Sequence, residues 1–288
     1  MENTLLVGID DSHESAVAAA WALEEAEALK WRIVLAHAVT PADVADPELE
    51  ARYFRRAVGE AERMFGPFLA DAAARNIPAE GRVVPGNAKD VLIQLSARAG
   101  IVVVGRRHRT GYTSRFGSVS SALAAHSSCW TAVIPETWRQ DDSTPAAVAD
   151  SGRSKFLGHV IVAVDEGPEA SSLLAVAAEM AHSHGVPMSA FTVVPDGAGP
   201  DSVSWLPDLL RPASEKHPGL QGASYTLKGA PSAEIAEAAH GARLLVVGSR
   251  GLSGLPGILR GSVSQAVLER SFSPVLVVPS RLLSHKQS

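Results

Sequence analysis

Short apolar runs alternate with longer amphipathic stretches through the first half of the chain. Such runs, when they end at glycine, proline or acidic residues, are typical of buried strands, and apolar residues at helical spacing are typical of helices. The first half therefore predicts alternating strands and helices. The expected strands are residues 4–10, 32–39, 79–84, 101–105 and 131–135, and the expected helices are residues 15–29, 47–75, 87–100 and 117–128.

The second half repeats this order. Its expected strands are residues 159–165, 187–194, 223–229, 243–248 and 274–279, with helices over 170–185, over 231–242 and after a glycine-rich loop. The middle of the second half differs, because five prolines interrupt the region that corresponds to the long helix 47–75. They are Pro195, Pro200, Pro207, Pro212 and Pro218. A short helix or a loop is expected there.

Near-continuous apolar strands that alternate with helices are typical of a parallel sheet covered on both faces. We therefore predict an α/β fold of two tandem open-sheet domains, each with a mainly parallel five-stranded sheet between helices. The polar, small-residue stretch between the halves has no apolar period and is predicted to be a linker. The predicted boundaries are domain 1–138, linker 139–155, domain 156–281 and tail 282–288.

The 288-residue composition is typical of a globular protein, with 46% hydrophobic and 20% charged residues. A net charge of −5 argues against a surface that coats nucleic acid, so no nucleic-acid partner is expected. No apolar run approaches the roughly 20 residues of a bilayer span, and the first residues lack a secretory pattern. We therefore expect no membrane association and a cytoplasmic location. A single cysteine, Cys129, permits no intrachain disulfide.

The most informative motif follows the fourth strand of the second half. It runs Gly248, two residues, Gly251, nine residues, Gly261 and Ser262. Glycines allow a tight turn and the close approach of backbone amides to a ligand, and the following helix N-terminus favours phosphate. Ser262 and Ser264 add hydroxyl donors, and Arg250 adds a cation. This motif predicts a phosphate-binding loop.

Other phosphate-binding motifs fit less well. A Walker loop needs a lysine before the helix serine, whereas this chain has Arg260-Gly261-Ser262. A dinucleotide fingerprint places closely spaced glycines after the first strand, where the chain has GIDDS and VDEGP instead. These segments also lack the Ser-Gly-Gly-x-Asp-Ser loop of the ATP-pyrophosphatase group.

The strand that ends in Asp, the Gly-x2-Gly-x9-Gly-Ser pattern and the closing fifth strand together resemble the universal stress protein family. The resemblance covers residues 3–137 and 156–281. It implies a Rossmann-like, adenine-nucleotide-binding fold whose loop holds the ribose and phosphates of ATP, with or without Mg²⁺. The residues it implies for the second half are Asp165, Val193, Val247, Gly248, Arg250, Gly251, Gly261, Ser262, Val263 and Ser264.

The first half carries a degraded copy of the motif. His108 stands where the second glycine belongs, the spacing to Gly117 is one residue short, and Ala38 replaces the valine. The residues that remain are Asp10, Gly105, Arg107, Gly117, Ser118 and Ser120. Two interpretations stay open: an altered second nucleotide site, or a copy that is kept for the fold and for dimer geometry.

The resemblance also implies that the last strands pair the two domains within the chain, and a homodimer of the chain is compatible with it. We expect a regulatory or stress-response role and no catalytic residues, with at most weak ATP hydrolysis, because no base or lysine is positioned. Asp10 and Asp165 belong to different halves and are not a catalytic pair. No metal site is expected, since His182 and His184 lie on different helix faces. The alternative is a dimerising scaffold of the same fold that binds no nucleotide.

Overall fold

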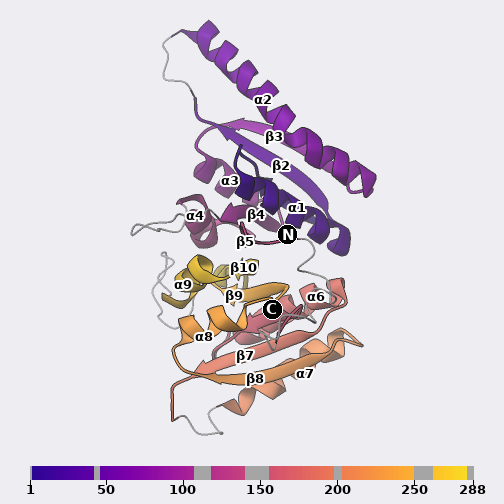
Figure 1. Ribbon diagram of the computed structural model, residues 1–288, viewed down its shortest axis with the longest axis vertical. Helices are drawn as coiled ribbons and strands as arrows, with labels where there is room; N and C mark the ends of the chain where they lie inside the picture. The colour runs from indigo at the N-terminus through magenta and orange to yellow at the C-terminus, as the bar shows by residue number, and fades with distance from the viewer. Residues whose placement is uncertain are drawn as a thin grey trace. The chain divides into compact units, whose positions relative to one another are not determined.

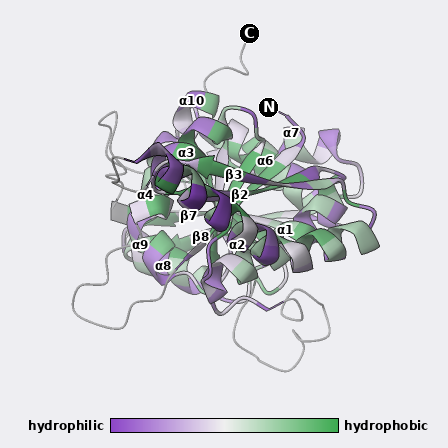
Figure 2. Cartoon of the chain, turned by 90° about the horizontal axis from the view of Figure 1, so that it is seen from above, coloured by the Kyte–Doolittle hydropathy of each residue, from purple (hydrophilic) through white to green (hydrophobic). Residues whose placement is uncertain are grey.

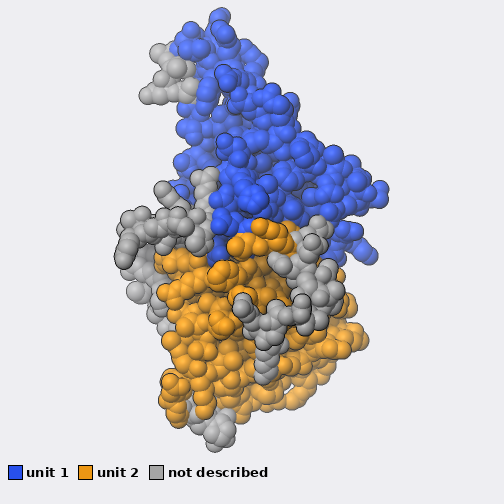
Figure 3. All heavy atoms as spheres, in the orientation of Figure 1, with its two compact units in different colours: residues 1–136 blue, residues 137–288 orange. Residues whose placement is uncertain are grey.

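A computed structural model of the chain describes residues 2–41, 46–106, 118–139, 156–197, 203–249 and 262–283. The chain divides into two compact units, residues 1–136 (unit 1) and 137–288 (unit 2), which are coloured separately in Figure 3. Most of the predicted linker, residues 140–155, lies outside the described residues.

Unit 1 alternates strands and helices as the sequence predicts (Figure 1). Its strands are β1 (Thr4–Gly8), β2 (Arg32–Val39), β3 (Ala79–Pro85), β4 (Ile101–Arg106) and β5 (Trp130–Pro135). Its helices are α1 (His13–Leu29), α2 (Pro47–Ala74), α3 (Ala88–Ser96) and α4 (Ser118–His126). The strands lie in the order β3-β2-β1-β4-β5 and all pairs are parallel.

Unit 2 repeats this arrangement. Its strands are β6 (Val160–Ala163), β7 (Met188–Val194), β8 (Gly222–Lys228), β9 (Leu244–Gly248) and β10 (Val275–Val278). Its helices are α6 (Ala170–His184), α7 (Trp205–Lys216), α8 (Pro231–Ala238), α9 (Ser262–Arg270) and α10 (Ser280–Leu283). The parallel order is β10-β9-β6-β7-β8.

Helices cover both faces of each sheet. In unit 1, α1 packs against α2 and α3 packs against α4, while in unit 2, α6 packs against α7 and α8 against α9. Side chains of the central strands are fully buried, as Ile101 and Ile161 illustrate. The helices carry both hydrophilic and hydrophobic residues, which fits one face on the sheet and one in water (Figure 2). The predicted α/β fold with two tandem parallel-sheet domains is confirmed.

Local sequence signals explain several helix ends. Asp46 caps α2 by accepting hydrogen bonds from the backbone of Glu48 and Leu49, and Pro47 occupies the first turn, where no backbone donor is needed. Gly185 ends α6 in the left-handed conformation. The proline-rich stretch of unit 2 forms the short helix α7 over 12 residues, in contrast to the 28 residues of α2.

The first strand of each unit is shorter than predicted. β1 ends at Gly8 and β6 at Ala163, so Asp10 and Asp165 each lie two residues beyond a strand end. In unit 1 the chain turns here because the Ser12 amide donates to the Asp10 carboxylate at 3.0 Å. Both carboxylates therefore belong to the loop between strand and helix rather than to the sheet.

Candidate functional site

The order of the strands places two loop segments of unit 2 side by side. β6 lies between β7 and β9, and the chain leaves β6 toward β7 but returns to the other side of β6 through β9. Ligands of open α/β sheets bind at the carboxyl ends of strands at such a switch point. Asp165 follows β6 and Gly248 ends β9, so both lie at this point of the sheet.

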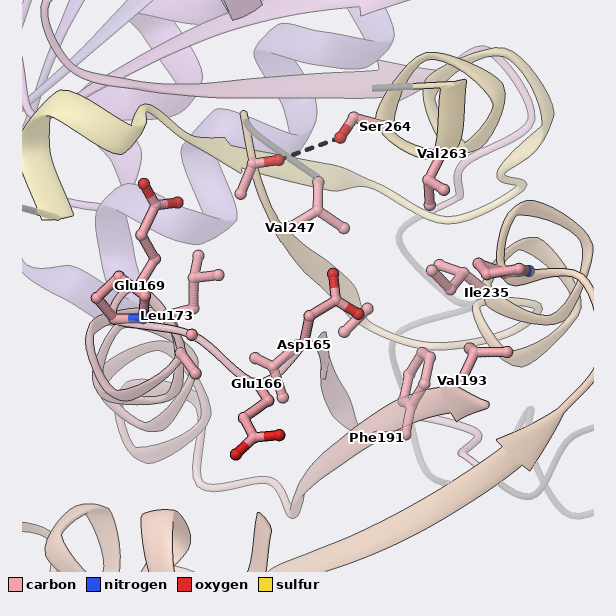
Figure 4. A pocket seen from close by; sticks show the side chains of 17 residues that line it. Asp165, Glu166, Glu169, Leu173, Phe191, Val193, Ile235, Val247, Val263 and Ser264 are labelled. Carbon is pink, nitrogen blue, oxygen red and sulfur yellow. Dashed lines mark hydrogen bonds between the residues drawn. The ribbon is translucent and has the colours of Figure 1, made fainter. Parts of the chain in front are cut away.

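A cavity of about 370 Å³ opens there, within the range of small-molecule sites (Figure 4). Six of the sequence-predicted residues line it: Asp165, Val193, Val247, Gly248, Val263 and Ser264. They come from four different parts of unit 2, namely the β6–α6 loop, β7, β9 and the first turn of α9. The remaining lining residues are Ala163, Val164, Glu166, Gly167, Pro168, Glu169, Ala170, Leu173, Phe191, Pro231 and Ile235.

One side of the cavity is apolar. Phe191 and Val193 belong to β7, and Ile235 belongs to α8 next to them in Figure 4. Val247 and Val263 extend this apolar lining on the β9 and α9 side. Such a surface suits a flat apolar group, because ligand pockets are lined predominantly by hydrophobic and aromatic side chains.

The polar side of the cavity is acidic among its described residues. Asp165, Glu166 and Glu169 line it, and their carboxylates point in three different directions in Figure 4. The Asp165 side chain is exposed, but the neighbouring walls remove part of its hydration, and this desolvation raises the pKa of its carboxyl. Asp165 is therefore a carboxylate that accepts a proton or a hydrogen-bond donor more readily than a fully hydrated one.

The first turn of α9 is tied to the end of β9. The buried Ser264 hydroxyl donates to the Gly248 carbonyl oxygen at 3.1 Å, the dashed bond in Figure 4. Val263 and Ser264 line the cavity, so the N-terminus of α9 lies at the cavity wall. The first amides of a helix have no partners within the helix, and together with the helix dipole they favour an anion.

Part of the predicted second-half site lies outside the described residues. Arg250, Gly251 and Gly261 belong to this group, as does the side chain of Ser262. The backbone of Ser262 begins α9, as the predicted helix start requires. The nucleotide-binding role of all ten predicted residues stays a prediction.

The sequence motif did not identify several residues that line this cavity, among them Glu169, Phe191 and Ile235. The signal for Phe191 was present, because it lies two positions before Val193 on the same strand and therefore on the same face. Ile235 and Glu169 gave no comparable signal. These two residues reach the cavity only because α8 and α6 pack on the sheet beside it.

Unit 1 has a corresponding cavity of about 230 Å³ at its own switch point between β1 and β4. Asp10, Gly105, Ser118 and Ser120 line it, as predicted for the first half. Arg107 and Gly117 lie outside the described residues, as does His108. The two units thus place equivalent strand-end residues around equivalent cavities.

The carboxylate of Asp10 has local hydroxyl partners. The Ser12 hydroxyl donates to Asp10, and the Ser12 oxygen accepts from the Ser15 amide at 3.2 Å, which makes Ser12 the N-cap of α1. The Ser15 hydroxyl donates to the Asp10 carbonyl at 2.8 Å. At the equivalent positions unit 2 has Gly167 and Ala170 in its cavity lining, so Asp165 has no such serine neighbours.

The strand that contributes the apolar wall differs most between the units. Gly8 pairs with Ala36 in β2, and Ala163 pairs with Phe191 in β7, so Ala36 and Phe191 are equivalent. Two residues further on, Ala38 corresponds to Val193. Ala36 and Ala38 line the unit 1 cavity, which therefore lacks the side chains that Phe191 and Val193 contribute to the unit 2 wall.

Two histidine rings of unit 2 pack against each other, and neither lines one of the two cavities. The ring centre of His182, at the end of α6, lies 4.9 Å from that of His217, which caps α7. The sequence analysis considered His182 together with His184 and did not predict this contact between α6 and α7. Among the residues that the structure describes, no group of three or more His, Cys, Asp or Glu side chains is arranged to hold a metal ion.

Comparisons with known proteins agree with this architecture. The model of the universal stress protein family matches residues 1–135 and 157–279, so the chain belongs to the universal stress protein family with two tandem domains. A universal stress protein of Mycobacterium tuberculosis is 26% identical over 301 residues, covering 96% of this chain and 97% of that protein. One from Mycolicibacterium smegmatis is 29% identical over 303 residues, covering 97% and 98%.

A solved structure shows the same tandem fold. The crystal structure of a universal stress protein from Archaeoglobus fulgidus matches with a TM-score of 0.72 and 21% identity, covering 97% of this chain and 99% of that one. The match of the family model confirms the sequence-based resemblance to this family. In the described residues, none of the helices combines the length and apolar character needed to cross a bilayer.

Proposed function

We propose that unit 2 binds an adenine nucleotide, ATP, in the cavity at the carboxyl ends of β6 and β9. The observation that carries this proposal is the convergence of Asp165, Val193, Val247, Gly248, Val263 and Ser264, predicted from sequence alone, around one cavity. A motif kept only for a surface turn would not be expected to gather residues from four separate elements around one volume of ligand size.

The chemistry of the cavity suits the two ends of ATP. The apolar wall of Phe191, Val193 and Ile235 offers a surface for the purine, and Asp165 offers an acceptor to its amino group or to a ribose hydroxyl. The N-terminus of α9, fixed by the Ser264–Gly248 hydrogen bond, offers amide donors to phosphates. Arg250, Gly251, Gly261 and Ser262 complete this proposed phosphate side, with or without Mg²⁺.

The proposed output is regulatory. Bound ATP would order its surroundings and shift the chain toward states that a protein partner recognises, which requires different ATP affinities in those states. Dedicated catalysis is not part of the proposal, and ATP hydrolysis, if present, is expected to be weak. We further propose a cytoplasmic role in the stress response, in keeping with the family name of the relatives.

Two further proposals concern assembly and the first half. The family resemblance implies that the two units pair through β5 and β10, and homodimerisation of the chain is compatible with it. Unit 1 is proposed as the weaker or inactive copy, because its cavity is smaller and carries Ala36 and Ala38 on the wall.

Protein purified without added nucleotide and then denatured tests the proposal. Chromatography of the released material is expected to show an adenine nucleotide, and calorimetric titration of the emptied protein with ATP, ADP, AMP and cAMP is expected to rank ATP first. The absence of both released nucleotide and measurable ATP binding would overturn the proposal in favour of a scaffold that binds no nucleotide.

A further inference from the structure

A network of hydrogen bonds joins three separate segments at the rim of the unit 2 cavity. The Ser249 amide donates to the Val278 carbonyl at 2.9 Å, which holds the end of β9 against β10. The Ser280 amide then donates to the Ser249 hydroxyl oxygen at 3.0 Å. The Ser280 hydroxyl donates to Glu169 Oε2 at 3.0 Å, across 111 positions of sequence.

Each member of this network has a defined place relative to the cavity. Ser249 directly follows Gly248, the first glycine of the motif, and is half-buried. Glu169 precedes α6 and lines the cavity. Ser280 begins α10 and is only 3% exposed. Because one partner is a carboxylate, the partly buried bond between Ser280 and Glu169 is of the stronger, charge-assisted kind.

Unit 1 uses different chemistry at the same positions. Arg106 follows Gly105 as Ser249 follows Gly248, and Glu136 follows Pro135 as Ser280 follows Pro279. Burial lowers the pKa of the Arg106 guanidinium, while the charge of Glu136 acts in the opposite direction. In both units the residue after the first glycine therefore interacts with the residue after the closing proline, through opposite charges in unit 1 and through the Ser280 amide and the Ser249 hydroxyl in unit 2.

We propose that Ser280, acting through Ser249 and Glu169, is a positioning residue of the unit 2 ligand site. Its amide holds the start of the glycine loop through Ser249, and its hydroxyl holds the Glu169 carboxylate at the rim. Without that hydroxyl, Glu169 is a cavity-lining anion that can turn toward the ligand phosphates and repel them. This inference rests on the proposed nucleotide site and assigns α10 to it.

The variant Ser280→Ala tests this role, with Ser172→Ala as a matched control. Ser172 also bonds α10, by donating to the Leu283 carbonyl at 3.3 Å, but it belongs to neither the Ser249–Ser280–Glu169 network nor the cavity lining. Loss of one hydrogen bond is expected to weaken ATP binding about fivefold in Ser280→Ala and less than about twofold in Ser172→Ala. Equal affinity changes in the two variants would overturn the positioning role.

A rescue variant separates positioning from simple destabilisation. In the double variant Ser280→Ala/Glu169→Gln, the carboxylate charge that Ser280 restrains is absent, so ATP affinity is expected to recover most of the fivefold loss. A destabilised fold would not recover when a second rim residue is changed. Failure of Glu169→Gln to restore any affinity would contradict the assigned role of the Ser280 hydroxyl.

Hydrogen exchange of the nucleotide-free variants keeps this test independent of the proposed function. Exchange of the segment Val246–Ser249 is expected to be several-fold faster in Ser249→Ala than in Ser172→Ala, because Ser249→Ala removes the hydroxyl that accepts the bond from the Ser280 amide. If wild-type protein binds no ATP but this difference is found, the nucleotide proposal fails and the anchoring stands. If the two variants exchange alike, the anchoring fails.

Discussion

Gly105, at the end of β4, lies directly against the first turn of α1 at Glu14. A β-carbon added to Gly105 would overlap the Glu14 carbonyl oxygen and carbonyl carbon, which belong to the backbone and cannot rotate away. The first glycine of the motif is therefore required by packing in unit 1, whether or not a ligand binds. This explains why Gly105 remains in a copy that has lost its second glycine.

Gly105→Ala is expected to destabilise unit 1 by about 1–3 kcal/mol, the usual cost of overpacking a close contact. Gly59→Ala is the matched control, because Gly59 lies inside α2 with nothing within 4 Å of an added β-carbon. Alanine there should stabilise the helix by roughly 0.5–1 kcal/mol. Urea unfolding of both variants measures these effects, and similar changes in the two would contradict the packing requirement.

Asp165→Asn is expected to stabilise ligand-free protein at neutral pH. Desolvation raises the pKa of the Asp165 carboxyl in the folded state above its ordinary value of about 3.9. Below about pH 3.9 the carboxyl is neutral in both the folded and the unfolded state, and its desolvation does not lower the free energy of unfolding. As the pH rises through the raised folded-state pKa, the carboxyl ionises and this part of the stability is lost. The melting midpoint of Asp165→Asn should therefore exceed that of wild type at pH 7, with a smaller difference near pH 4.

Asp10→Asn provides the comparison for that experiment, since Asp10 lies in the equivalent loop but has serine hydroxyl and amide donors. Removing its charge weakens those bonds, so no gain in stability is expected at pH 7. A gain of equal size in both variants would contradict the specific desolvation of Asp165.

His159 is expected to make the stability of unit 2 depend on pH. Its Nδ1 lies 2.9 Å from the Ser189 hydroxyl, and burial lowers the pKa of its imidazole below about 6.5. Because the folded-state pKa is lowered, the neutral imidazole contributes its full share to the free energy of unfolding above about pH 6.5. This contribution is lost as the pH falls through the folded-state pKa. His159→Gln should flatten the decline of the melting midpoint between pH 7 and pH 5.

The exposed His13 of unit 1 supplies the control for His159. His13→Gln is expected to leave the pH dependence of unit 2 unfolding as it is in wild type. An unchanged pH profile in His159→Gln would show that burial of this imidazole does not control stability in this range.

The alternation of apolar runs predicted the elements well, because the inner strands of each parallel sheet, such as β4 and β9, are buried on both faces. Strand β2, for example, begins and ends at the predicted residues Arg32 and Val39. The ends of β1 and β6 were placed too far along the chain. The run of apolar residues continues to Ile9 and Val164, whose amides still bond the neighbouring strand, and the chain leaves the sheet at the aspartate that follows.

The candidate site was predictable where a motif is local and was missed where it depends on packing. Gly248, Val263 and Ser264 follow from one continuous segment around the glycine loop. Glu169 and Ser280 meet across 111 positions of sequence, and each looks like an ordinary helix-start residue on its own. Only the folded arrangement of α6 and α10 brings them together at the cavity rim.

The central claim is that ATP binds in unit 2, in the cavity at the carboxyl ends of β6 and β9. The most direct test is the shift of the melting midpoint by excess ATP in two equivalent variants, Val263→Asp and Val119→Asp, which place a carboxylate in the unit 2 and unit 1 cavities respectively. Tight binding raises the midpoint of the native protein. We predict that Val119→Asp keeps the wild-type shift and that Val263→Asp loses it, whereas a shift retained in Val263→Asp would contradict the claim.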